Sequence, residues 1–274
     1  MRAFLSLLLA CCLPQAMATV SYYQPDASDL WWNPDESGWG VNMIMQYDTI
    51  FATFFIYGPD GKARWYTASD MKSTGAPADM PQHFTGRLYE TTGPVVTNAP
   101  YNPSAVTRRD VGAVDFEYLR PNGGYITYSI DGVTVSKQVR RQTWATADIT
   151  GEFYLNRVLR PHLCNGPNTG HEPSLNEPGV MTVARSGSAV QISVRPAAPS
   201  TLSCTYTGNA TQSGRMTTVN GDYTCSDGNS GPFTLSEIQV SDWGFVSRLS
   251  MKQGGCWWGG HFGGTRTTVF ESPS

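Results

Sequence analysis

Residues 49–69 read TIFATFFIYGPDGKARWYTAS, and this stretch decides the fold class. Its first part, TIFATFFIY at 49–57, is rich in the β-branched and aromatic residues that favour extended chains. Both faces of that segment are apolar or aromatic, which predicts a strand covered on both sides. GPDG at 58–61 holds turn residues, and KARWYTAS at 62–69 returns as the partner strand. The stretch therefore predicts an antiparallel hairpin.

The same alternation of short apolar runs and turns continues along the chain. Asp131-Gly132 separates runs at 125–130 and 133–141, and a two-residue Asp-Gly loop is a strong hairpin signal. Residues 90–112 and 160–178 are expected to be long loops. Further strands are expected at 40–46, 84–89, 114–119, 149–155, 179–184, 189–194, 202–206, 216–225, 232–240, 245–251 and 261–270. The pattern predicts an all-β protein of antiparallel barrels or sandwiches.

Composition supports this fold class and excludes others. The 274 residues include 28 Gly, 18 Pro and 8 Trp, and 15% are charged, against about 25% in a usual globular domain. So many turn formers argue against long helices. The hydrophobic share of 40% is too high for disorder and too evenly spread for a multi-span membrane protein.

The first 18 residues, MRAFLSLLLACCLPQAMA, have the pattern of a secretory signal peptide. Arg2 precedes a short apolar core, and Ala16-Met17-Ala18 forms a small-x-small cleavage site. A lipoprotein signal with its anchor at Cys11 is the alternative. No later run reaches the roughly 18 apolar residues of a membrane helix. We expect a periplasmic or secreted protein with no transmembrane segment in the mature chain.

The net charge and the placement of the basic residues make a nucleic acid an unsuitable partner. The net charge is −3, and the basic pairs Arg108-Arg109 and Arg140-Arg141 would point to opposite faces of a strand. Neither pair can form the dense basic patch that phosphate binding requires.

Four cysteines remain after the leader, Cys164, Cys204, Cys225 and Cys256, which predicts two disulfides in an exported chain. Three pairings are possible, and we favour Cys204–Cys225 with Cys164–Cys256. Metal binding is not expected, because the sequence lacks a Cys-x-x-Cys spacing. All four lie in one half, which divides the mature chain into a cysteine-free β domain at 19–147 and a disulfide-linked β domain at 148–274. A single large barrel is the alternative.

The most distinctive stretch is DLWWNPDESGWG at 29–40. Flat aromatic rings beside short polar side chains suit a sugar ring or another planar ligand, since they offer stacking and hydrogen bonds. The competing interpretation makes the tryptophans a plug of the barrel core and the polar residues a turn. The candidate ligand-binding residues are Trp31, Trp32, Asn33, Glu36, Trp39, Trp65 and Tyr66.

This stretch, with residues 49–69 after it, resembles a family of uncharacterised exported bacterial proteins that open with W-W-N-P-x-E-S-G-W-G. In that family a hairpin of the pattern F-A-T-W/F-F-x-Y-x-x-x-G-x-x-x-W-Y comes next. The resemblance continues at SIDGVTVSKQVRRQTW (129–144), CTYTG (204–208), QSGRM (212–216) and YTCSDG (223–228). It covers most of the mature chain and implies export, and it carries over no activity.

Signals for catalysis are weak. Ser37 lacks the Gly-x-Ser-x-Gly elbow, and the chain has no glycine-rich phosphate loop. The histidines at 83, 162, 171 and 261 have no zinc spacing, and residues 226–231 lack the calcium-loop order. We therefore expect no cofactor and no metal. A glycosidase would need two facing acids, and Asp35, Glu36, Asp70 and Glu90 are those near the aromatic cluster.

These observations favour an exported, non-catalytic binding or interaction module for a glycan, another small ligand or a protein. One alternative is a secreted hydrolase acting on polysaccharide or cell-wall material, in which Asp35 or Glu36 would face another acid or a histidine. The other is an inhibitor or assembly factor, which would present an ordered, exposed loop among 90–112 or 160–178. Trp257-Trp258, after Cys256, is expected to pack on a disulfide.

Overall fold

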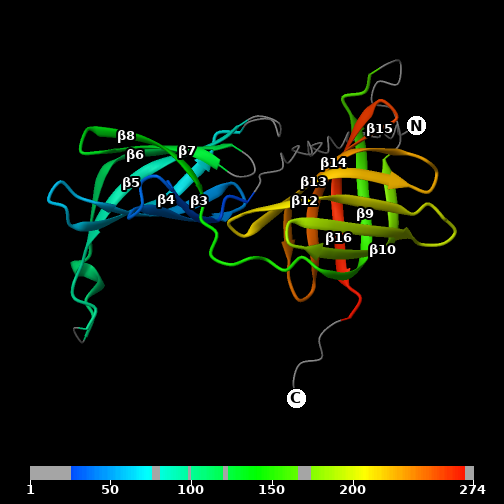
Figure 1. Cartoon of the computed structure of the whole chain (residues 1–274). Coiled ribbons are helices and arrows are strands. Elements are labelled where there is room, and N and C mark those ends of the chain that lie inside the picture. The colour runs from blue at the N-terminus through cyan, green and yellow to red at the C-terminus, as the bar shows by residue number, and fades with distance from the viewer. Residues whose placement is uncertain (1–25, 76–80, 98–99, 120–122, 166–173, 269–274) are drawn as a thin grey trace, which may run out of the picture.

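A computed structural model describes residues 26–75, 81–97, 100–119, 123–165 and 174–268. These residues form two closed antiparallel barrels of eight strands each (Figure 1). The predicted all-β fold class is therefore confirmed. The expected leader at 1–18 lies outside the described residues.

In the first barrel each strand pairs with its neighbour in sequence, and β8 pairs back to β1 to close the ring. The strands are β1 (Asp29–Trp32), β2 (Gly40–Gln46), β3 (Thr49–Tyr57), β4 (Ala63–Ser73), β5 (Gln82–Thr92), β6 (Thr107–Leu119), β7 (Gly123–Ile130) and β8 (Val133–Arg141).

The second barrel repeats this up-and-down order and closes through β16 and β9, paired from Trp257–His162 to Arg266–Phe153. Its strands are β9 (Gly151–His162), β10 (Leu175–Ser186), β11 (Ala189–Pro196), β12 (Cys204–Ser213), β13 (Met216–Cys225), β14 (Ser230–Val240), β15 (Gly244–Gln253) and β16 (Cys256–Arg266).

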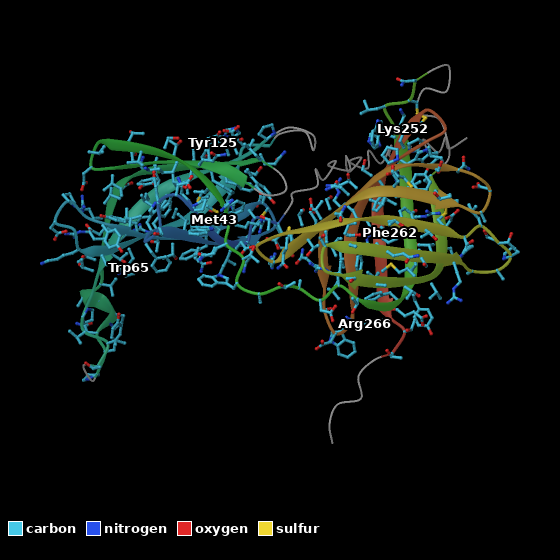
Figure 2. The ribbon with its side chains drawn as sticks, in the orientation of Figure 1. Met43, Trp65, Tyr125, Lys252, Phe262 and Arg266 are labelled. Carbon is cyan, nitrogen blue, oxygen red and sulfur yellow. A yellow bond between two sulfur atoms is a disulfide. The ribbon has the colours of Figure 1, made fainter. Side chains whose placement is uncertain are left out.

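Inward-facing side chains fill both barrels, as expected for eight strands, whose ring is just wide enough for packed side chains. In the first barrel, Trp31 meets Phe116 and Tyr118 edge-on, with ring centroids 5.0 and 5.6 Å apart. In the second, Tyr206 lies 5.1 Å from Phe233. Figure 2 labels one buried residue of each core, Met43 and Phe262.

In the second barrel, two glycines face each other across β12 and β13. Gly208 pairs with Gly221. A Cβ on Gly221 would lie 2.0 Å from the carbonyl oxygen of Thr207, so no other residue fits there without moving the backbone. Glycines of this kind let strands coil tightly enough to close a small barrel.

The two predicted disulfides, and the favoured pairing, are confirmed. Cys204 and Cys225 are directly opposite each other in β12 and β13. Cys164, which follows β9, is joined to Cys256 at the start of β16. Disulfides persist in oxidising compartments, so the protein matures in an oxidising environment. Within the described residues, no helix is both long and apolar enough to cross a membrane.

Three local expectations were wrong. The loop expected at 90–112 is shorter, because β5 runs to Thr92 and β6 begins at Thr107. The loop expected at 160–178 is shorter as well, because β9 runs to His162 and β10 begins at Leu175. Most residues of these strand ends are polar and half-buried or exposed, so the ends lack the apolar alternation that marks a strand. Third, β3 is covered on one side only, because Phe51, Phe55 and Tyr57 point outward and are exposed.

A hairpin of the second barrel contacts one end of the first. At the turn between β12 and β13, the backbone N–H of Arg215 donates to Asp29 Oδ2 at 3.2 Å. The N–H of Gly214 donates to Thr143 Oγ1 at 2.9 Å, and Arg215 also forms an ion pair with Asp26. In Figure 1 this hairpin reaches toward the first barrel.

Candidate functional site

The loop at 33–39, the centre of the WWNPDESGWG stretch, joins β1 to β2 at one rim of the first barrel. The N–H of Asp35 donates to Asn33 Oδ1 at 3.0 Å, and the N–H of Glu36 donates to the Asn33 carbonyl at 3.1 Å. Gly38 has a φ of 110°, a conformation that suits glycine. Asn33 therefore builds the turn, and Asp35 is left exposed to solvent.

Glu36 fixes this loop to β8, the strand that pairs with β1. Its carboxylate accepts hydrogen bonds from Lys137 Nζ at 2.8 Å and from Trp39 Nε1 at 3.2 Å. The hydrogen bond from Lys137 is the largest influence and lowers the pKa of Glu36, against a smaller opposing effect of burial. Glu36 is therefore an ionised anchor, whereas a general acid needs a raised pKa.

Two of the predicted ligand-facing rings belong to the core instead. Trp31 is fully buried, and its Nε1 donates to the Ala27 carbonyl at 2.9 Å. Tyr66 is also buried, next to Phe54 on β3, and burial raises its pKa. Neighbouring residues of a strand point to opposite faces, so a Trp-Trp or Trp-Tyr pair always divides between core and surface. Trp31 and Tyr66 cannot contact a ligand on the surface.

The partners of these rings in sequence point outward. Trp32 is half-buried, opposite Arg140 on β8. Trp65 is 52% exposed, and its cross-strand partner Phe55 is 50% exposed. In Figure 2 Trp65 lies at the periphery of the first barrel, on the side away from the second barrel.

Trp65 and Phe55 border a surface hollow of about 230 Å³ at the barrel rim. Tyr57 and Gly38 also line it. Gly38 is the only residue of the loop at 33–39 among the lining residues, and it has no side chain. A Cβ on Gly38 would lie 3.4 Å from the Tyr57 hydroxyl oxygen. We call the surface formed by Gly38, Phe55, Tyr57, Arg64 and Trp65 the rim hollow.

Arg64 supplies the positive charge of the rim hollow. It forms ion pairs with Asp60 at 3.2 Å and Glu90 at 3.6 Å. Its side chain lies across Gly58, where a Cβ would come within 2.3 Å of Arg64 Nε. Within the described residues, that Nε has no hydrogen-bond acceptor. The guanidinium is thus held in place, with its Nε buried.

Arg64 belongs to a network of ion pairs that joins the ends of β4, β5 and β6. Arg109 pairs with Glu90 at 2.8 Å and with Asp131, and hydrogen bonds to both carboxylates raise the pKa of Arg109. Asp131 closes the β7–β8 turn with a φ of 49°. Arg64, Glu90, Arg109 and Asp131 together are a structural network, since each charge already has an opposite partner.

The acids considered for hydrolysis do not form a facing pair. Glu36 is bound to Lys137, Glu90 to two arginines, and Asp70 to Lys72 at 3.3 Å. Asp35 is exposed on the turn. In the part of the chain that the structure describes, no group of three or more His, Cys, Asp or Glu side chains is arranged to hold a metal ion.

The four histidines are placed separately. His83 contacts Asp115 at 3.1 Å, His162 ends β9, and His261 lies on the outer face of β16. His171 lies outside the described residues. The indole rings of Trp257 and Trp258, next to the Cys256 disulfide, are both half-buried in β16.

Sequence reasoning missed Phe55, Tyr57 and Arg64 as members of the site. A usable signal was present, because the turn at 58–61 sets the hairpin register and places Phe55 opposite Trp65. The assumption that β3 was covered on both sides removed Phe55 and Tyr57 from consideration. Of the predicted residues, the structure brings together Glu36 and Trp39 in one hydrogen bond and leaves Trp65 on the outer surface.

One more feature bears on the alternative of a partner-binding protein. The described residues of the connection between β5 and β6, 93–97 and 100–106, project from the barrel and contain the short helix η1 (Pro103–Ala105) (Figure 1). Val95, Val96 and Tyr101 are exposed on it, Val96 by 82%. Asn102 Oδ1 accepts a hydrogen bond from the Ser104 N–H at 3.1 Å, which orders its helical turn. We call residues 93–97 and 100–106 the arm.

Comparison with protein-family models gives no match for this chain, and none of the curated proteins is similar to it in sequence.

Proposed function

We propose that the protein is an exported binding module that holds a sugar residue of a glycan in the rim hollow, without catalysis. The observation that carries this proposal is the pairing of two half-exposed rings, Trp65 and Phe55, on the outside of a closed barrel. Large aromatic side chains are normally buried, so adjacent exposed rings point to a binding surface.

The chemistry of the rim hollow suits a sugar. The rings of Trp65, Phe55 and Tyr57 offer flat apolar area for the C–H faces of a pyranose, at a small cost in side-chain entropy. Arg64 adds a positioned donor for a hydroxyl group, since its side chain is 39% exposed and its guanidinium is held by Asp60 and Glu90. A few fixed polar groups in a mainly apolar hollow are typical of small-ligand sites.

The electrostatics favour binding over hydrolysis. A glycosidase needs one carboxylic acid with a raised pKa beside a second carboxylate. Glu36, the acid nearest the aromatic residues of the loop, has a lowered pKa and a lysine partner. This arrangement supplies a rigid loop and no proton donor.

The proposal includes export to the periplasm or the cell exterior through cleavage after residue 18, with lipid anchoring at Cys11 as the alternative. Two disulfides support an oxidising destination. The proposed membership in the family that opens with W-W-N-P-x-E-S-G-W-G agrees with export and leaves the ligand open.

Calorimetric titration of the mature chain with soluble neutral oligosaccharides tests the proposed function. We expect at least one sugar to bind and Trp65→Ala to weaken it by about tenfold or more, because the variant removes the main stacking surface. Trp243→Ala is the matched control, since Trp243 is 70% exposed on the second barrel and should not affect affinity. Equal affinity in wild type and Trp65→Ala would refute the proposal.

The arm favours a second candidate function, as the docking element of an inhibitor or assembly factor. The arm exposes Tyr101 beside Val95 and Val96, and tyrosine is enriched among the residues that anchor protein interfaces. A photo-crosslinking residue at Val96, used in cells that export the protein, should yield one discrete adduct. The same residue at Val133, which is 66% exposed on β8, is the control. Equal adducts from both positions, or none from Val96, would contradict this function.

A further inference from the structure

The outer wall of the first barrel carries a second, larger hollow. It has a volume of about 600 Å³ and lies over β4 to β8. Its lining is unlike that of the rim hollow, because hydroxyl and charged side chains replace most of the rings. We call it the wall hollow; the members used below are Asp70, Arg87, Tyr89, Ala113, Asp115 and Thr127.

Irregular strand pairing creates the wall hollow. The register between β4 and β5 shifts between Thr67 and Lys72, and the register between β5 and β6 shifts between Leu88 and Tyr89. Such bulges bend a strand and redirect side chains, and they are frequent beside functional sites. Gly86 and Ala113 line its floor and present little or no side chain, which leaves space there.

The polar groups of the wall hollow are held by neighbours. Asp110 accepts two hydrogen bonds from Arg87, at 2.8 and 2.5 Å. Asp115 lies 3.1 Å from His83 Nδ1, and Thr127 Oγ1 lies 2.9 Å from Ser136 Oγ. Each group therefore meets a ligand in an orientation that is already fixed, which lowers the entropy cost of binding.

An aromatic ring stands among these groups. Tyr89 lines the wall hollow, and the guanidinium of Arg108 lies over its ring, 4.6 Å from the centroid. One face of the ring is thus covered by a cation, which fixes the ring for contact with a ligand at its remaining surface.

The charged groups of the wall hollow already have partners. Arg87 is balanced by Asp110 and Asp70 by Lys72, and Asp115 contacts His83, so none of these charges is left over for an ionic ligand. Carboxylates accept hydrogen bonds from hydroxyl groups, and Arg87, Thr127 and Tyr89 can donate to or pack against the same ligand. A neutral, polyhydroxylated molecule satisfies all of these groups.

We propose that the wall hollow is a second sugar-binding subsite of this chain, specific for neutral sugar residues. Trp65, Thr67 and Ser69 are alternate residues of β4, and Ser69 lines the wall hollow. At about 3.3 Å per residue, Trp65 and Ser69 are about 13 Å apart along the strand. One glycan of several residues therefore reaches from the rim hollow to the wall hollow. The inference rests on the proposed function for its ligand class.

The test compares trimers and hexamers of neutral sugars by calorimetric titration of the mature chain: cellohexaose, xylohexaose, chitohexaose and the corresponding trimers. Ala113→Leu fills the floor from an exposed position on β6 without removing a polar partner. We expect it to weaken hexamer binding by about tenfold and to leave trimer binding at Trp65 unchanged. Gln138→Leu, at an exposed position of β8 opposite Tyr125, is the matched control and should change neither.

The outcomes separate this inference from the proposed function. Hexamer binding that falls in Trp65→Ala but is unchanged in Ala113→Leu would overturn the inference and keep the proposed function. The reverse pattern would support the wall hollow and overturn the rim hollow. Failure of every hexamer to bind would overturn both. Unfolding curves of each variant establish that affinity, and not folding, has changed.

Discussion

Glu36 shows how one side chain can connect a loop, a ring and a distant strand. Its carboxylate binds Trp39 three residues away and Lys137 on β8. Because the pKa of Glu36 is lowered by Lys137, folding favours the ionised form. The resulting stability is present above the ordinary pKa of a glutamate and is lost as the pH falls through the lowered pKa of the folded protein. The loop at 33–39 should therefore loosen only in acid.

Replacing Lys137 tests this electrostatic link at the residue scale. In Lys137→Met we expect the pKa of Glu36 to rise toward its ordinary value, because the largest cause of the shift is gone. Carboxyl chemical shifts followed through a pH titration measure it. Lys72→Met is the control, since Lys72 pairs with Asp70 instead. An unchanged Glu36 titration in Lys137→Met would show that another group sets this pKa.

At the scale of the element, the sequence predicted strands well where turns and apolar alternation agreed. The bounds of β2, β3, β8 and β13 match the expected ranges 40–46, 49–57, 133–141 and 216–225. Strands with polar ends were predicted too short, as in β5 and β9, because hydrogen bonding to a neighbour continues after the apolar pattern stops. The alternation of apolar and polar residues indicates which side chains can be buried. It does not indicate how far the backbone hydrogen bonds to a neighbouring strand extend.

The candidate site was predicted less well, for a related reason. Phe51, Phe55 and Tyr57 form an apolar outer face of β3, and such a face predicts that another part of the chain packs against it. The sequence cannot show that no such part does so. Trp31 was assigned to the ligand together with its neighbour Trp32, although consecutive residues of one strand point to opposite faces of the sheet. The wall hollow left no sequence signal, since two bulges and a glycine create it.

At the scale of the whole molecule, two stretches that stand out in the sequence meet where the barrels join. Asp29 begins DLWWNPDESGWG, and Gly214 and Arg215 belong to QSGRM. Asp29 Oδ2 accepts a hydrogen bond from the buried Arg141 at 3.0 Å as well as from the Arg215 N–H. One carboxylate thus ties an arginine of the first core to the hairpin of the second barrel. The contact uses the barrel end opposite the rim of the loop at 33–39, so it leaves both hollows free.

Gly214→Ala should uncouple the two barrels. A Cβ at Gly214 would lie 2.1 Å from Asp29 Oδ2, and the residue has a φ of 58°. Gly187→Ala is the matched control, because Gly187 has a φ of 60° in the β10–β11 turn and nothing lies within 4 Å of a Cβ there. Both variants pay the same backbone strain of about 1 kcal/mol, whereas only Gly214→Ala displaces Asp29.

Calorimetry distinguishes these variants. We expect one unfolding transition in the wild type and in Gly187→Ala, and two separated transitions in Gly214→Ala, because the variant removes the Asp29–Arg215 contact and strains the hairpin that carries the remaining contacts between the barrels. Arg141 would also lose an acid that its buried guanidinium needs, so the first barrel should unfold at the lower temperature. A single transition in Gly214→Ala, shifted no further than in Gly187→Ala, would mean that Asp29 stabilises its own barrel and does not couple the two.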